Sequence, residues 1–276
     1  MKKKRYRLKK KYDILFTKII MTILLIILSF STFKIYEYLY NNKQIKNIEE
    51  TVLNNVDVQI INIENYEIEE PPEYDKDSLY WKYKEVSMID VDINKLKEEN
   101  SDTVGWLQVE GTNINYPVVK ANDNEYYLKH DFLKKNNRAG WIFMDYRNDL
   151  DNLDRNTIIY GHKMKDSTMF GTLSNLLQKE WLNNEDNHII KVASNNNSYL
   201  FQIFSLYTVQ DETYYINNEF TDDNSFNEFI TTIKNRSIHN FKTKVNNDDK
   251  IMTLSTCYGK EKRLVVHAKL IRTIKK

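Results

Sequence analysis

The sequence predicts a mostly β fold, in which short strands close into a barrel with a few inserted helices. Short runs rich in β-branched and aromatic side chains recur from residue 106 to the C-terminus. Turn residues such as Gly, Asn and Asp separate them. The regular alternation of strands with long helices that indicates a parallel α/β fold is not found in the pattern. One apolar segment precedes this region and predicts an N-terminal transmembrane helix.

The N-terminus has the charge pattern of a membrane anchor. Residues 1–12 carry eight Lys or Arg and no acidic residue, and residues 13–34 are predominantly apolar. An apolar stretch of about 20 residues crosses a hydrocarbon core of roughly 30 Å. A cleaved signal peptide is the alternative, but the segment is long for one and no small-residue cleavage site follows. We therefore expect an uncleaved single-pass anchor in the cell membrane, with the N-terminus cytoplasmic and the rest extracellular.

The charge of the remainder argues against nucleic-acid binding. The whole chain has a formal net charge of +1, and removing the eight N-terminal cations leaves −7. Basic residues of the body are interspersed with acids, so the basic tail fits lipid headgroups rather than nucleic acid. Residues 35–80 are interpreted as a juxtamembrane helix and an acidic spacer containing Pro71 and Pro72. Residues 81–276 are expected to form one domain, which is long enough to bury a core.

The first half of this domain changes from helical to strand periodicity. A short helix is expected over 92–100, where Asp92 can act as the N-cap. Alternating apolar residues predict strands over 106–110 and 114–119, on either side of a turn at Gly111. The next elements predicted are a helical turn, a strand, a polar surface loop and a buried strand, at 126–132, 140–144, 147–156 and 157–160.

The second half predicts two helices and four strands. A helix is expected over 169–177, and a hairpin over 188–193 and 199–209 across three consecutive asparagines. A clean amphipathic helix is expected over 224–235, because four large apolar residues recur there at helical spacing. The last two strands are predicted at 251–257 and 263–272.

The only cysteine of the chain, Cys257, comes at the end of a predicted strand. A free cysteine is most often a small buried hydrophobe, and that is the alternative reading here. Exported proteins, however, tend to have paired cysteines or none. A single cysteine at a strand end, with Arg263 at the start of the next strand, is therefore a candidate nucleophile.

Among five histidines, His162 is the candidate acid–base partner, since it follows a buried strand and Gly161 as Cys257 follows its own strand. His130, His188 and His239 are expected to be structural. His267 lies within a strand, and there we expect a packing role or a contact that supports the site residues from behind. A zinc site from Cys257 and histidines is weakly supported, because no close pair has ligand spacing. No metal or cofactor is therefore expected.

Cysteine catalysis requires an accessible thiolate, an imidazole that exchanges protons with it, and a donor for the tetrahedral oxyanion. Cys257, His162 and Arg263 supply one of each. One enzymatic alternative is an L,D-transpeptidase, which usually has an arginine two residues after the cysteine, but this chain has Gly259 there. The other is a papain-like peptidase, in which the cysteine precedes the histidine, whereas His162 precedes Cys257 in this chain. A membrane-tethered binding module with a buried cysteine is the non-enzymatic alternative.

The chain resembles the sortases, and specifically those of class B, from about residue 100 to the C-terminus together with the membrane anchor. The segments that carry the resemblance are Asn100–Trp106, Thr112–Val118, Asp123–Leu128, Ile158–His162, Met169–Gly171 and Thr253–Cys257, together with Arg263. The motif Thr-Leu-Ser-Thr-Cys together with an upstream strand that ends in Gly-His is specific, whereas any one segment alone would be weak. The helix at 224–235 is similar to the extra helix of class B.

This resemblance implies an eight-stranded barrel and a cysteine transpeptidase. Cys257 would attack the Thr carbonyl of a C-terminal sorting motif in secreted proteins, with His162 as acid then base and Arg263 as oxyanion donor. A peptidoglycan amine would resolve the thioacyl intermediate and leave the protein attached to the wall. By position, the substrate-binding residues would be Asn124, Leu128, Ser255, Tyr214, Tyr215 and Ile216. The six-residue spacing from Cys257 to Arg263 is short for the family, so a tight turn is expected.

Overall fold

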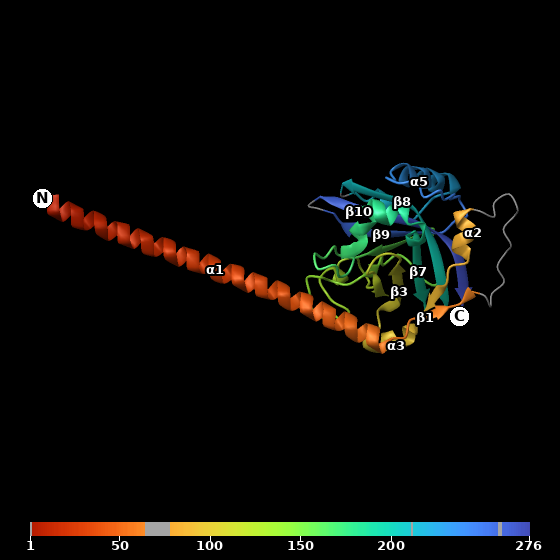
Figure 1. The fold of residues 1–276 in the computed structure, drawn as a ribbon, viewed down its shortest axis with the longest axis horizontal. Helices are drawn as coiled ribbons and strands as arrows, with labels where there is room; N and C mark the ends of the chain where they lie inside the picture. The colour runs from red at the N-terminus through yellow and green to blue at the C-terminus, as the bar shows by residue number, and fades with distance from the viewer. Residues whose placement is uncertain (1, 64–77, 211, 259–260) are drawn as a thin grey trace. The chain divides into compact units, whose positions relative to one another are not determined.

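The computed structural model describes residues 2–63, 78–210, 212–258 and 261–276 (Figure 1). Residues 64–77, which include the prolines of the expected spacer, lie outside the described residues. The chain divides into two compact units, Met1–Gln44 and Ile45–Lys276.

The first unit lies within one helix, α1 (Lys2–Asn55). From Tyr12 onward this helix contains an 18-residue window with a mean hydropathy of 2.4, and none of that window is buried in protein. By length and composition it can cross a membrane, as expected for residues 13–34.

The second unit is a closed barrel, which confirms the predicted fold class. Its strands follow one another in the order β10-β8-β7-β3-β4-β5-β6-β9. Their bounds are β3 (Thr103–Val109), β4 (Asn115–Val119), β5 (Phe143–Met144), β6 (Asn156–Tyr160), β7 (Ile189–Ser194), β8 (Asn197–Gln210), β9 (Ile251–Cys257) and β10 (Lys262–Lys275). All eight predicted strands are present, but β5 is shorter than the expected 140–144.

The pairing of β6 with β9 brings distant parts of the chain together. These two strands run parallel, with Tyr160 opposite Ser255, whereas β9 and β10 are antiparallel neighbours. Because parallel strands end at the same edge of a sheet, the residues that follow β6 and the last residues of β9 lie side by side. Periodicity alone does not reveal this pairing.

Short elements precede the first barrel strand or connect the barrel strands to one another. They are β1 (Gln59–Ile61), α2 (Leu79–Lys84), β2 (Met88–Asp90), α3 (Ile93–Glu99), η2 (Tyr126–Leu128), η3 (Gly171–Leu177), α4 (Lys179–Asn183), η4 (Glu185–Asn187) and η5 (Tyr214–Ile216). The side chain of Asp92 caps α3 by accepting from the backbone N–H of Lys95 at 3.1 Å, as expected. The helix expected over 169–177 is a 3₁₀ segment, η3.

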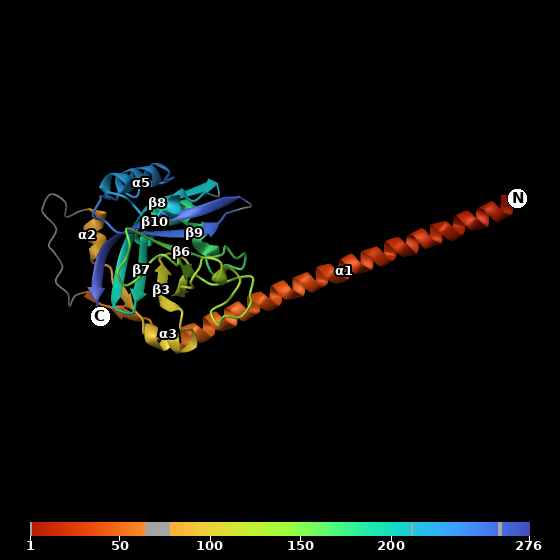
Figure 2. The same cartoon turned by 180° about the vertical axis from the view of Figure 1, so that it is seen from behind.

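Helix α5 (Asp223–Asn235) lies beside β8 and β10 in both views (Figures 1 and 2). A capping box between Asp222 and Ser225 begins it, and the buried face carries Phe226, Phe229 and Ile233. These side chains form a second apolar cluster with residues of β8, β9 and β10. The strand that ends at Cys257 is thus supported from outside the barrel.

The end of α1 belongs to the second unit. Ile45, Ile48 and Val52 are buried in the same apolar cluster as the barrel interior. Glu49 of this segment accepts a hydrogen bond of 3.0 Å from the hydroxyl of Tyr116 on β4. The sequence suggested a domain boundary at residue 81, but the compact unit begins at Ile45. The apolar stripe of this part of α1 packs against the barrel and so belongs to the same unit.

Candidate active site

Cys257 is the last residue of β9 and is exposed. On the neighbouring strand Arg263 lies directly opposite, and its Nη1 donates to Cys257 Sγ at 3.2 Å. The backbone N–H of Tyr258 donates to the carbonyl of Lys262 at 2.8 Å. Residues 259–260 of the expected tight turn lie outside the described residues. An exposed thiol contradicts the alternative of a buried structural cysteine.

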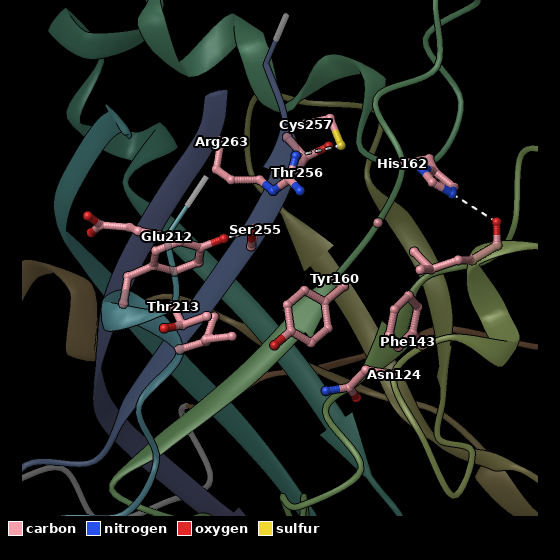
Figure 3. Close-up of a pocket in the computed structure, with 14 residues that line it drawn as sticks. Asn124, Phe143, Tyr160, His162, Glu212, Thr213, Ser255, Thr256, Cys257 and Arg263 are labelled. Carbon is pink, nitrogen blue, oxygen red and sulfur yellow. Dashed lines mark hydrogen bonds between the residues drawn. The ribbon is translucent and has the colours of Figure 1, made fainter. Parts of the chain in front are cut away.

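His162 reaches the same place from the end of β6. Its Nε2 lies 2.9 Å from the carbonyl oxygen of Leu128. A carbonyl only accepts hydrogen bonds, so Nε2 carries the proton and Nδ1 is left to exchange a proton with the thiol. In Figure 3 the sulfur of Cys257 lies between the guanidinium of Arg263 and the imidazole of His162. The backbone of Leu128, rather than a third acidic side chain, orients the ring.

The pKa of His162 is raised above its usual value. Hydrogen bonding with the side chain of Cys257 is the main cause, and burial of the ring opposes it. The hydrogen bond to Leu128 also favours the charged ring, while Arg138 disfavours it. The site therefore favours an imidazolium beside the sulfur, the protonation state that a leaving amine requires of a general acid.

Close packing holds Leu128 against His162. Gly140 adopts a φ of +57°, and a Cβ there would lie 2.3 Å from the carbonyl oxygen of Tyr127 and 3.1 Å from Cδ2 of His162. Any larger residue would push this loop away from the imidazole. Gly140 is therefore part of what keeps the Leu128 carbonyl within hydrogen-bond distance.

A pocket of about 280 Å³ opens beside these three residues. Its lining residues are Asn124, Leu128, Phe143, Tyr160, Gly161, His162, Glu212, Thr213, Tyr215, Ile216, Ser255, Thr256, Cys257 and Arg263. The three expected catalytic residues are therefore together, and five of the six expected substrate-binding residues line the same pocket.

Tyr214 is the exception among the expected residues. Its ring packs against Phe229 of α5 with centroids 5.5 Å apart, and the guanidinium of Arg236 lies 5.3 Å from the ring centroid. The next residue, Tyr215, turns inward instead, and its hydroxyl lies 3.0 Å from Ser255 Oγ on β9. The side chains of neighbouring residues in a short 3₁₀ segment point in different directions. The sequence alone does not reveal which of the two tyrosines faces the pocket.

Sequence reasoning missed six lining residues. They are Phe143, Tyr160, Gly161, Glu212, Thr213 and Thr256. Gly161 and Thr256 immediately precede His162 and Cys257, and this adjacency could have identified them. The other four come from strand ends and a loop whose approach to the pocket depends on barrel closure.

The remaining histidines have structural contacts, as expected. His130 bonds the Tyr126 carbonyl at 2.7 Å and stacks on that ring, and His188 bonds the Leu182 carbonyl at 3.0 Å. His267 is fully buried between Thr253 and Tyr207, at 2.8 and 2.9 Å. Among the residues that the structure describes, no group of three or more His, Cys, Asp or Glu side chains could hold a metal ion.

Comparison with known proteins identifies relatives of this chain. A family model of the sortase domain matches residues 107–271. Sortase B of Listeria monocytogenes is 39% identical over 185 residues, which cover 65% of this chain and 74% of that protein. Sortase B of Staphylococcus aureus is 40% identical over 181 residues, which cover 64% and 73%. The solved Staphylococcus aureus sortase B–substrate complex superposes with a TM-score of 0.61 at 39% identity, covering 66% of this chain and 84% of that one.

Proposed function

Because this chain belongs to the sortase family of cysteine transpeptidases and is similar to its class B members, we propose that it cleaves a C-terminal sorting motif of secreted proteins after Thr and transfers them to a peptidoglycan amine. The observation that carries the proposal is the convergence of Cys257, His162 and Arg263 on one pocket. The thiol of Cys257 can serve as nucleophile, the imidazole of His162 as acid and base, and the guanidinium of Arg263 as oxyanion donor.

In the first half of the reaction the sulfur of Cys257 attacks the Thr carbonyl. A C–S bond forms and the carbonyl electrons move to oxygen, where the guanidinium of Arg263 stabilises the oxyanion. Collapse of the tetrahedral species breaks the C–N bond, and His162 donates its proton to the leaving amine. The product is a thioester between Cys257 and the sorted protein.

In the second half the roles reverse. Neutral His162 accepts a proton from the incoming peptidoglycan amine as that amine attacks the thioester carbonyl. Arg263 stabilises the second oxyanion, and the C–S bond then breaks to release the thiolate of Cys257. The sorted protein leaves through a new amide bond, and the imidazolium–thiolate pair is restored.

The pocket is proposed to bind the sorting motif. Asn124, Ser255 and Tyr215 offer polar groups, and Leu128 and Ile216 offer apolar surface. A few polar groups in a mainly apolar pocket are suited to fixing the orientation of an extended peptide. Tyr214 is assigned no direct contact, since its ring packs on Phe229.

We further propose that the apolar part of α1 anchors the enzyme in the cell membrane, with the barrel outside the cell. The apolar window of α1 and the eight cations before it support this topology. Anchoring would hold the active site near secreted substrates and near the peptidoglycan that supplies the amine.

The proposal is tested by incubating the protein with a library of peptides that contain Thr, with and without a peptidoglycan-derived amine. Mass spectrometry should detect cleavage after Thr, and a ligated product only when the amine is present. Cys257→Ala should abolish both products while circular dichroism shows that the fold survives. Unchanged turnover in that variant would refute the assignment of the nucleophile.

A further inference from the structure

A buried carboxylate, Asp145, lies behind the pocket and organises two of its sides. It directly follows β5, and its side chain is 0% exposed. Nothing in the sequence pattern distinguishes it from the other acids of the polar loop that follows. Its contacts, however, reach both the β6 side of the pocket and the loop that contains η5.

On the first side Asp145 holds two residues that line the pocket. Its Oδ2 accepts from Nδ2 of Asn124 at 2.9 Å and from the hydroxyl of Tyr160 at 2.8 Å. Since a carboxylate only accepts, the amide nitrogen of Asn124 must face it, and the amide orientation is fixed. The backbone N–H of Tyr146 donates to Asn124 Oδ1 at 3.0 Å, which agrees with that orientation.

Through Arg147 the same carboxylate reaches the second side. Nε and Nη2 of Arg147 donate to the two oxygens of Asp145, each at 2.8 Å, in a bidentate pair. Nη2 also donates to the carbonyl of Ile216 at 3.1 Å. Nδ2 of Asn156 bonds the carbonyls of Tyr215 and Asn217, so three successive carbonyls of this loop are fixed.

Burial alone would raise the pKa of Asp145, but its hydrogen bonds from Arg147, Tyr160 and Asn124 outweigh burial and lower it. The group therefore stays ionised at neutral pH, with five donors directed at two oxygens. A buried carboxylate is costly unless its lone pairs accept hydrogen bonds. Here two of the five donors belong to the pocket residues Asn124 and Tyr160, and the other three belong to Arg147.

We propose that Asp145 is a positioning residue for the peptide, which orients the amide of Asn124 and the loop at Ile216 for binding the sorting motif. This inference rests on the proposed transpeptidase function. With its nitrogen turned to Asp145, Asn124 presents one remaining N–H and one remaining lone pair to an extended peptide. The hydrogen bonds described for the side chain of Asp145 come from Asn124, Tyr160 and Arg147, so its proposed role is in recognition rather than in the chemical steps.

Asp145→Asn tests the inference with almost no change of shape. Oδ1 accepts two hydrogen bonds from Arg147, and Oδ2 accepts three, from Arg147, Asn124 and Tyr160. In the variant one of these positions becomes an NH₂ group that faces donors, whichever way the new amide turns. Asn124 or Arg147 must then move, and the KM for a cleaved sorting peptide should rise at least about tenfold, with kcat within about threefold.

A second readout separates positioning from damage to the catalytic residues. The rate at which iodoacetamide alkylates Cys257, and its pH dependence, should be the same in Asp145→Asn as in the wild type. Asp249→Asn is the matched control, since Asp249 pairs with Lys269 near the opposite end of β9 and should leave KM unchanged. If Asp145→Asn does not fold, Tyr160→Phe removes one hydroxyl bond to the carboxylate and should raise KM severalfold.

The possible failures can be told apart. If the wild type cleaves peptides and both Asp145→Asn and Tyr160→Phe retain its KM, only the role of Asp145 is overturned. Slower alkylation of Cys257 in Asp145→Asn would likewise overturn it, because the residue would then act on the catalytic group. If the wild type cleaves no Thr-containing peptide, the proposed function fails, and this inference fails with it.

Discussion

At the scale of single residues, the protonation of His162 is controlled mainly by Cys257. Because the pKa of His162 is raised, its imidazolium persists at a pH where an ordinary histidine, with a pKa near 6.5, has lost its proton. The activity that requires a protonated His162 should therefore extend to higher pH and fall as pH rises through the raised value.

Cys257→Ala should lower the pKa of His162, because the group that chiefly raises it is removed while burial remains. The measurement is an NMR titration of the His162 ring protons in the two proteins. Asp249→Asn, distant from the ring, should not change the titration. A pKa that is unchanged or higher in Cys257→Ala would show that the sulfur does not govern the imidazole.

Arg263→Lys should reduce kcat/KM by on the order of 10²-fold, a loss comparable to removing one oxyanion donor. Lysine keeps the positive charge but not the planar fork that reaches both the sulfur and a developing oxyanion. Steady-state cleavage of a sorting peptide measures the effect. The matched control is Arg155→Lys, since Arg155 lies just before β6 and pairs with Asp223. Near-normal rates in Arg263→Lys would contradict the role of Arg263 as oxyanion donor.

At the scale of elements, the parallel pair β6–β9 creates the site. Buried polar groups fix the register of these strands: Thr253 Oγ1 donates to Oδ1 of Asn156 across the pair at 2.6 Å, and lies 2.8 Å from Nδ1 of His267 on β10. A slip of one residue would turn these groups toward apolar neighbours and would move Cys257 away from His162. The interior polar network thus specifies how the strands align.

His267 makes this network sensitive to acid. Burial lowers its pKa to about 3, below the value near 6.5 expected in the unfolded chain. The unfolded state then binds more protons below pH 6.5, so stability is full above that pH and is lost as pH falls toward 3. The free energy of unfolding should drop by about 1.4 kcal/mol per pH unit from this group alone.

The measurement is urea unfolding at pH 7 and pH 5, compared with His267→Gln, which cannot titrate at this position. His188 also has a lowered pKa and adds to the slope in both proteins, whereas the raised pKa of His162 opposes it. The difference between the two slopes therefore reports His267. Equal slopes would mean that the pKa of His267 is the same in the folded and the unfolded state.

At the scale of the whole molecule, the boundary between the two compact units falls inside α1, between Gln44 and Ile45. Removing residues 1–40 should leave a soluble and active domain, because the apolar window is removed and Ile45, Ile48 and Val52 stay in the core. Gel filtration without detergent and peptide cleavage measure these properties. A requirement for detergent would contradict the anchor hypothesis.

Removing residues 1–55 is the informative comparison. Three buried aliphatic side chains are then lost, each contributing roughly 2 kcal/mol, so the unfolding free energy should fall by about 6 kcal/mol relative to the shorter deletion. Chemical denaturation of the two truncated proteins measures the difference. Equal stability would show that this segment of α1 adds nothing to the barrel.

Much of the architecture follows from local sequence patterns. Alternation and β-branched content predicted each barrel strand, and the apolar spacing of Phe226, Phe229 and Ile233 predicted α5. These patterns are reliable because each element buries one face against a common core. The packing partner of residues 45–55 could not be predicted, because an apolar stripe on a helix indicates that one face is buried but not which element buries it.

The sequence by itself determined the chemistry: a single cysteine and a histidine after strands, an arginine beginning the next strand, and an apolar helix behind a basic tail. Only the tertiary structure decided that β6 and β9 are parallel neighbours, that the Leu128 carbonyl orients His162, and that Tyr215 rather than Tyr214 faces the pocket. The reason is physical. Side-chain type and periodicity are local properties, whereas strand pairing and the direction of a loop side chain depend on closure of the whole barrel.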